Sequence, residues 1–227
     1  WDLANLTITP APDSDVDFTL NVSATATDGD ATAISTGSIA VSVAADADVP
    51  TLVLDAASAS GLEDTAISLP DITSSLTDVD GSESLSLSIG DIPEGATLTS
   101  GTDTYTAPAG GGSVDVTGWD LTSLQITPPA DSAADFSLSV SSTSTEADGG
   151  DAETVLGNIG ISVTGVADAP TLTPVDVSGA EDTAIPLDIT AGLSDADGSE
   201  VLLVRISDVP EGASLSAGTD MGGGNWS

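Results

Sequence analysis

The sequence predicts an all-β protein made of tandem two-sheet sandwiches. Apolar and small polar residues alternate in short runs, for example in residues 18–22, 38–43, 85–89 and 136–140, and a period of two is typical of half-buried strands. Asp-Gly, Pro-Glu-Gly and Gly-Gly turns separate these runs. The sequence also repeats with a period as long as one whole domain, which indicates tandem units. We expect about seven strands in each unit.

The repeat is carried by four segments that return in the same order. They are residues 47–52 and 167–172, 63–67 and 181–185, 78–83 and 195–200, and 92–96 and 209–213, at offsets that run from 167 − 47 = 120 to 195 − 78 = 117. This period is much longer than that of solenoid repeats and close to the length of one β-sandwich domain.

Asp-x-Pro segments set the frame of the predicted units. Residues 1–48 form the second half of one domain, residues 49–168 a complete domain, and residues 169–227 the first half of a third. We expect the chain to be a fragment of something longer, cut within its repeats. Because the two halves together make one domain, the last part of one copy could complete the first part of the next and cover open strand edges. The alternative, that these boundaries are accidental, stays open.

Composition excludes several classes of partner. The chain has 37 Asp and Glu residues against one basic residue, Arg205, and a net charge of −36. Such a charge disfavours binding to nucleic acid or to an anionic membrane surface, and no apolar run approaches the length of a membrane span. Aromatic residues make up only 3% of the chain, so we expect cores of Val, Ile, Leu and Ala.

Composition also restricts the chemistry of any site. The chain has no Cys and no His, which excludes disulfides, thiolate or imidazole metal sites, and Ser-His-Asp or Cys-His catalysis. Oxygen ligands remain, and these suit hard cations such as Ca²⁺. We therefore expect calcium as the cofactor and no enzymatic activity.

Recurring acidic residues beside Pro and Gly are the candidate calcium ligands. We expect three clusters to meet near each junction between units, with a fourth at the end of a late strand. The linkers supply Asp46, Asp48 and Asp168; the Asp-x-Asp-Gly loops supply Asp78, Asp80, Asp195 and Asp197; the Glu-Asp-Thr segments supply Glu63, Asp64, Glu181 and Asp182; and the late strands supply Asp28 and Glu146. Each cluster alone also fits a plain Asx turn, and most of the other acids fit a role in solubility.

The order of these motifs resembles the cadherin-like tandem repeats of giant bacterial adhesins, which type I systems secrete and which often carry RTX repeats. The resemblance covers the full chain. It implies immunoglobulin-like Greek-key sandwiches with calcium at the interdomain junctions, and it adds Asp13 and Asp131 to the ligands, where cadherins have an acidic stretch before the sixth strand. The linker has fewer acids than a cadherin linker and lacks its Asn residues, and the Leu-Asp-Arg-Glu motif is absent, so the number of ions per junction stays open.

The resemblance implies an extracellular, secreted segment on a bacterial surface that acts in adhesion or biofilm fibres. The leading hypothesis is a calcium-rigidified stalk whose partners are the neighbouring repeats of the same chain. One alternative is a filament of identical chains joined by split-domain completion. Another is a calcium-dependent carbohydrate-binding module, which the three Trp, one Tyr and two Phe residues make less attractive. A two-carboxylate glycosidase is disfavoured because the acids fall at turns and junctions.

Overall fold

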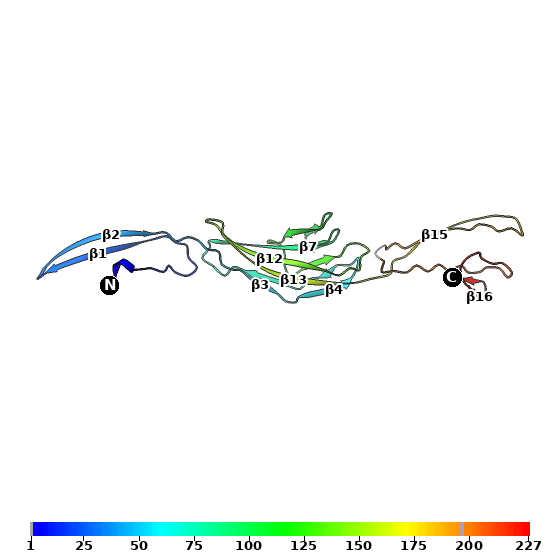
Figure 1. Cartoon of the computed structure of the whole chain (residues 1–227), viewed down its shortest axis with the longest axis horizontal. Coiled ribbons are helices and arrows are strands. Elements are labelled where there is room, and N and C mark those ends of the chain that lie inside the picture. Colours follow the sequence, from blue (N-terminus) through cyan, green and yellow to red (C-terminus); the bar gives the residue numbers. More distant parts are fainter. Residues whose placement is uncertain (1, 196–197) are drawn as a thin grey trace.

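The computed structural model describes residues 2–195 and 198–227, and it has an elongated shape with a β-sandwich at its centre (Figure 1). It confirms the predicted all-β fold. Among the described residues, helical structure is limited to η1 (Leu3–Asn5), a single 3-10 turn that the Asp2 side chain caps by accepting a hydrogen bond from the N–H of Ala4.

The central sandwich consists of two main sheets and one short strand pair. The first sheet has the order β10-β7-β12-β13-β4, with β4 at Ser58–Leu62, β7 at Glu83–Ile92, β10 at Gly112–Asp115, β12 at Phe136–Glu146 and β13 at Ala152–Thr164. The second has the order β5-β11-β8-β9, with β5 at Ile67–Ser68, β8 at Thr97–Ser100, β9 at Asp103–Thr106 and β11 at Leu124–Thr127. β3 (Thr51–Leu54) pairs with β6 (Ile72–Ser75).

The pairing joins strands that are far apart in the sequence. β4 runs parallel to β13, whereas the other pairs of the sandwich are antiparallel. The unit has eleven strands, not about seven, and several of them are only two to five residues long. The segment between β5 and β6, which lie in different sheets, contains Pro70, which has no N–H to donate to a ladder.

Aliphatic side chains between the two sheets form the core, as predicted. The cluster contains buried Ile, Leu, Val and Ala residues, among them Ile89, Leu98 and Leu138, each 0% exposed. Trp119 is partly buried against this cluster, which agrees with a packing role. Inward-facing residues of β12 alternate with outward-facing ones down to its last residue, Glu146.

Smaller sheets flank the sandwich on both sides. On the N-terminal side, β1 (Phe18–Asp28) and β2 (Ala31–Val41) form a long antiparallel hairpin. On the C-terminal side the pairs are β14 (Thr171–Val175) with β15 (Asp188–Gly192), and β16 (Asp220–Gly222) with β17 (Asn225–Trp226).

The repeat is visible in the backbone as well as in the sequence. Six aspartates have a positive φ between 51° and 60°, and they form three pairs at the repeat offsets: Asp13 with Asp131, Asp64 with Asp182, and Asp91 with Asp208. Asp tolerates this left-handed conformation better than most non-glycine residues. Equivalent loops of the repeats therefore share a local conformation.

Candidate metal centre

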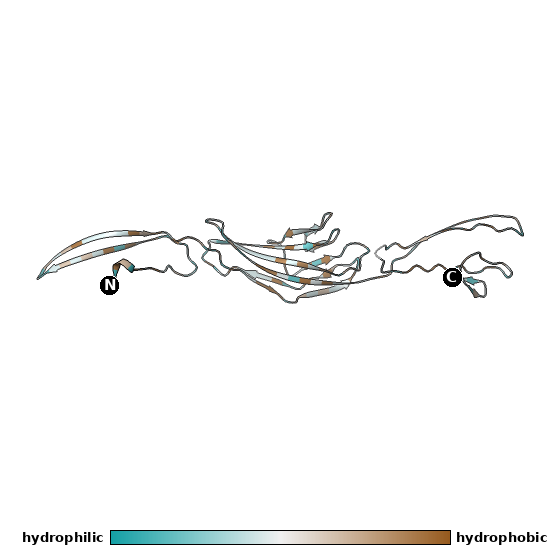
Figure 2. Cartoon of the chain, in the orientation of Figure 1, coloured by the Kyte–Doolittle hydropathy of each residue, from teal (hydrophilic) through white to brown (hydrophobic). Residues whose placement is uncertain are grey.

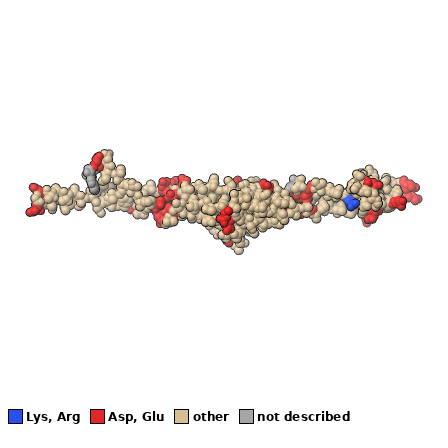
Figure 3. Space-filling model, turned by 90° about the horizontal axis from the view of Figure 1, so that it is seen from below, with Lys and Arg blue, Asp and Glu red and all other residues tan. Residues whose placement is uncertain are grey.

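The first junction, between β2 and the central sandwich, gathers acidic side chains from three parts of the chain. A hollow of about 380 Å³ lies there. Its acidic lining consists of Asp13 and Asp15 from the loop before β1, Asp46 and Asp48 from the linker, and Asp78 and Glu146 from the sandwich. Figure 3 shows acidic side chains gathered beside the central sandwich at this end. Six carboxylates around one hollow offer only oxygen ligands, the kind that hard cations prefer.

Glu146 and Glu83 place two carboxylates opposite each other at the edge of this junction. They are directly paired residues of antiparallel strands β12 and β7. Like charges in such a position destabilise a sheet. Glu146 is only 4% exposed, and the Oε2 atoms of both residues are buried and have no hydrogen-bond partner in the described chain. A bound cation would satisfy both oxygens.

Burial raises the pKa of Glu146 above its ordinary value of 4.5. A side-chain hydrogen bond from Ser82 opposes the rise, and the negative charges of Glu83, Asp15 and Asp80 add to it. The opposite holds for Asp80, whose pKa is lowered because the Ser82 side chain and backbone N–H hydrogen-bond to its carboxylate. The pKa values of these two carboxyl groups are thus shifted in opposite directions.

These shifts predict how the metal-free protein responds to acid. Since the pKa of Glu146 is raised in the folded state, folding takes up a proton there, and the free energy of unfolding should rise as the pH falls from about 7 towards 4.5. Below 3.8 the trend should reverse, because Asp80, Asp115 and Asp120 have lowered pKa values and lose their hydrogen-bonded charged forms. Urea unfolding across this range tests both limbs.

Glu146→Gln serves as the control for the pH profile. It should flatten the upper limb and leave the acid limb in place. A free energy of unfolding that falls steadily from neutral pH would contradict the account of Glu146.

The second junction, between the central sandwich and β14, holds a compact aspartate triad. Asp64, Asp131 and Asp168 each offer a carboxylate oxygen, and these atoms lie within 4.8 Å of one another. The backbone N–H of Asp131 donates to Oδ1 of Asp64 at 3.0 Å. The triad joins the preceding sandwich to the linker, because the first two residues belong to sandwich loops and the third to the linker.

Two glutamates hold the backbone of the same linker. Glu63, which is 1% exposed, accepts a hydrogen bond from the N–H of Val166 through Oε1. Glu200, in the following repeat, accepts one from the N–H of Asp168 at 2.6 Å. The second oxygen of each glutamate is buried without a partner among the described residues. Nearby, Asp195 is 1% exposed and accepts a hydrogen bond from the Ser199 hydroxyl at 3.0 Å.

The two junctions repeat one arrangement. The N–H of Asp48 donates to Oε1 of Glu83 at 2.6 Å, as the N–H of Asp168 does to Glu200. In both cases the other glutamate oxygen is buried and unpartnered in the described part of the chain. The Ser144 hydroxyl also donates to the carbonyl of Asp48, so the first linker is fixed to β12 as well.

The structure corrects the predicted grouping of the acidic clusters. Glu63 and Asp64 were expected beside Asp78 and Asp80, but they lie at the second junction. The reason is the parallel pairing of β4 with β13. Both strands end at the same end of the sandwich, so the residues after β4 meet the linker that follows β13.

Other predicted ligands lie away from both junctions. Asp28 is exposed at the far tip of the β1–β2 hairpin, and Glu181 and Asp182 are exposed in the loop between β14 and β15 (Figure 1). By the repeat offsets, Asp28 is the counterpart of Glu146, and Glu181 and Asp182 are the counterparts of Glu63 and Asp64. Asp197 lies outside the described residues.

Sequence reasoning missed four acids that the structure brings to the junctions. These are Asp15, Glu83, Asp151 and Glu200, of which Asp151 accepts a hydrogen bond from the N–H of Ala47 at 3.3 Å. Glu83 and Glu200 could have been found, because they close the recurring Asp-x-Asp-Gly-Ser-Glu segment. Asp151 could also have been found, because Gly150-Asp151-Ala152 has the same residues as Gly29-Asp30-Ala31 at the turn of the equivalent hairpin.

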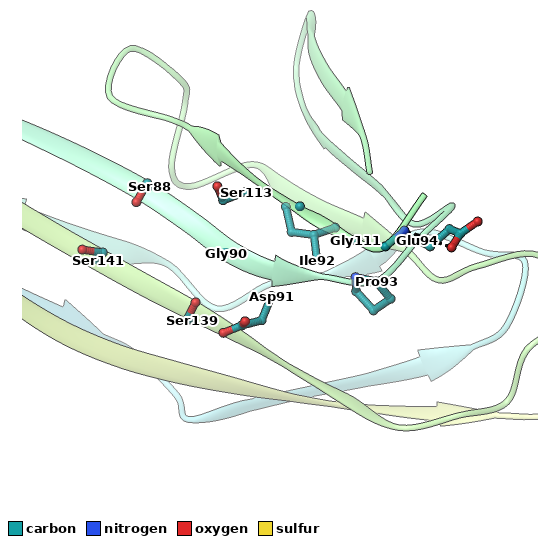
Figure 4. A pocket seen from close by; sticks show the side chains of 12 residues that line it. Ser88, Gly90, Asp91, Ile92, Pro93, Glu94, Gly111, Ser113, Ser139 and Ser141 are labelled. Carbon is teal, nitrogen blue, oxygen red and sulfur yellow. Dashed lines mark hydrogen bonds between the residues drawn. The ribbon is translucent and has the colours of Figure 1, made fainter. Parts of the chain in front are cut away.

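A separate hollow lies on the outer face of the first sheet (Figure 4). It measures about 670 Å³ and lies over β7, β10 and β12. Its lining includes Ser88, Ser113, Ser139 and Ser141 with several glycines, and it contains no aromatic side chain. A surface of this kind offers hydroxyl groups but no ring on which a sugar could stack, so it does not favour the carbohydrate-binding alternative.

No protein-family model matches the chain, and no curated protein matches it. Within the described residues, the structure contains no helix of the length and apolar character needed to cross a membrane.

Proposed function

We propose that this chain is a non-enzymatic structural segment, an extracellular stalk or fibre of a bacterial surface adhesin whose junctions are stiffened by calcium. The observation that carries the proposal is the duplicated linker contact. At both junctions a linker aspartate donates its N–H to a glutamate whose second oxygen is buried without a partner in the described chain.

Calcium fits this arrangement better than other common ions. It takes six to eight oxygen ligands and tolerates irregular geometry, whereas Mg²⁺ demands a near-ideal octahedron. The first junction places six carboxylates around one hollow. With one Arg and no Lys or His in the chain, protein cations cannot neutralise that charge.

A cation at the second junction would act on both neighbouring repeats. Val166 is hydrogen-bonded to Glu63 of the central sandwich, and Asp168, two residues later, to Glu200 of the next repeat. Binding at these carboxylates would therefore fix the linker to both sides at once. An extracellular location supplies the free calcium that modules of this kind need, since their affinities are in the range of about 10⁻⁴ to 10⁻³ M.

Removing the two predicted ligands of the Asp-x-Asp-Gly loop tests the proposal at the first junction. The double variant Asp78→Asn/Asp80→Asn should bind calcium at that junction at least about tenfold more weakly, because two carboxylate ligands become neutral amides. The sandwich should stay folded, and binding at the second junction should not change. Isothermal titration of metal-free protein with calcium measures both.

Asp55→Asn/Asp71→Asn is the matched control. It removes the same charge from two exposed residues that contribute no hydrogen-bonding carboxylate to either junction. Its calcium isotherm should equal that of the unmodified protein. Equal isotherms for all three proteins would rule out the assignment of the first junction.

A further inference from the structure

The central sandwich lies in series with the chain on either side of it. The first linker leads into β3 and then β4, and the second linker follows β13. Figures 1 and 2 show the two linkers at opposite ends of the sandwich. A pull along the chain therefore reaches β3 and β4 from the first junction and β13 from the second.

β4 and β13 lie on this load path and pair with each other. They run parallel, from Ser58 beside Gly160 to Leu62 beside Thr164. Tension draws β4 back towards the first junction and β13 forward towards the second, so the two strands are pulled in opposite directions along their common axis. All the hydrogen bonds between them then carry the load together, whereas a pair pulled apart from one end breaks its bonds one at a time.

Backbone hydrogen bonds extend this pairing at both ends. The N–H of Gly160 donates to the carbonyl of Ala57 at 2.9 Å, and the N–H of Glu63 donates to the carbonyl of Thr164 at 3.1 Å. The Glu63 side chain in turn accepts a hydrogen bond from the N–H of Val166. The β4–β13 contact, residues 57–63 with residues 160–166, is therefore longer than the paired strands alone.

Both strands are also anchored in the sandwich. β13 pairs with β12 over residues 152–161. β4 packs closely on the second sheet, because a Cβ atom at Gly61 would lie only 2.6 Å from Cγ1 of Ile67 in β5. A glycine in a strand permits such a close approach. Since β13 is bound to β12 along most of its length, β4 is the strand that has to slide for the unit to open.

We propose that the β4–β13 contact is the force-bearing contact of the central unit and sets how long the unit stays folded under tension. The contact consists of backbone hydrogen bonds and close packing, so it acts without a bound ion and goes beyond the proposed calcium sites. Its use by the cell rests on the proposed stalk. β3 precedes β4 on the load path and pairs with β6, so its release adds a short length of chain before the main step.

Unfolding of the full chain at constant force, in chelator, tests the proposal with two sets of attachment points. Tethers at the two chain ends load β4 and β13 along their common axis. Because the chain has no Cys, Thr65→Cys/Ala167→Cys moves the tethers to two exposed residues at the second junction, and this pull separates the strands one bond at a time. Forced unfolding follows the unfolding rate, so the end-tethered chain should stay folded at least about tenfold longer at the same force.

The main unfolding step is recognised by its length. Failure of the contact frees 164 − 57 = 107 residues, from Ser58 to Thr164, which extend to about 350 to 385 Å. The tethers at residues 65 and 167 span 167 − 65 = 102 residues. The two steps are therefore similar in length, and the two lifetimes can be compared directly.

Two proline substitutions test the hydrogen bonds themselves. The bonds of Ala57 and Glu63 set the phase of the ladder, so Ala59 directs its N–H towards β13 and Ser60 directs its N–H away. Ala59→Pro should shorten the lifetime of the end-tethered chain about tenfold, because it removes a donor from the ladder. Ser60→Pro is the matched control, since it places the same ring one residue later and removes no donor to β13, and its lifetime should equal that of the unmodified chain.

Equal lifetimes for the two sets of attachment points, or for the two proline variants, would overturn the proposal. Ala59→Pro should also reduce the difference between the two attachments, which a general loss of stability would not do. The comparison of attachments keeps β4 and β13 unmodified, so it decides the proposal even if Ala59→Pro does not fold. Calcium binding is measured separately by titration, and a failure of the β4–β13 contact would leave the proposed function standing.

Discussion

Calcium is expected to raise the thermal unfolding midpoint of the metal-free protein by about 10 °C or more for each site that it fills. At a ligand concentration of one hundred times Kd, one site adds about 2.7 kcal/mol to the free energy of unfolding, and each kcal/mol shifts the midpoint of a domain of this size by about 4 °C. The gain is large because the metal-free junctions store repulsion. Two carboxylates whose oxygens lie within 4.8 Å of each other repel by about 1 kcal/mol or more in a partly solvated environment.

Differential scanning calorimetry in calcium and in chelator measures the shift, and small-angle scattering under both conditions measures the stiffness of the junctions. The maximum dimension should vary less in calcium, because the linker is then fixed to both neighbouring repeats. Sodium chloride and Mg²⁺ at matched ionic strength are the controls. If either raises the midpoint as far as calcium does, screening of the net charge of −36, and not a coordinated ion, would explain the stability.

Much of the fold followed from local pattern alone. Alternation in residues 136–140 predicted β12, and the structure extends the same inward and outward alternation to Glu146. The aliphatic core followed from a composition poor in aromatic residues, and the buried cluster confirms it. These features are local because the side-chain period of a strand does not depend on which strand lies beside it.

The arrangement of the acids could not be predicted in the same way. Which loops share an end of the sandwich depends on strand direction, and the parallel pairing of β4 with β13 has no signature in the alternation of either strand. That single pairing moves Glu63 from the first junction to the second. Glu83 and Glu146 lie directly opposite each other because of the register in which β7 and β12 pair. This register cannot be read from either strand alone.

Local sequence also cannot predict why equivalent residues of the repeat differ in burial. Ile39 and Ile159 are equivalent in sequence and in strand position, yet one is 53% exposed and the other 0%. Local sequence makes both residues part of a strand with an apolar face. Burial needs a second layer, which the central sandwich has and which the described residues do not supply to the β1–β2 hairpin. Identical substitutions at these two positions therefore separate the contribution of the strand from that of the packed core.

Ile159→Ala is expected to lower the free energy of unfolding of the central sandwich by about 2 to 5 kcal/mol, whereas Ile39→Ala in dilute solution should change it by less than about 0.5 kcal/mol. The first substitution leaves a cavity among fully buried neighbours, and the second removes methyl groups that already contact water. Urea unfolding of both variants at low protein concentration, followed by the fluorescence of the three Trp residues, of which Trp119 packs against the core of the sandwich, gives the two differences. Equal costs would mean that the hairpin is already covered in the monomer.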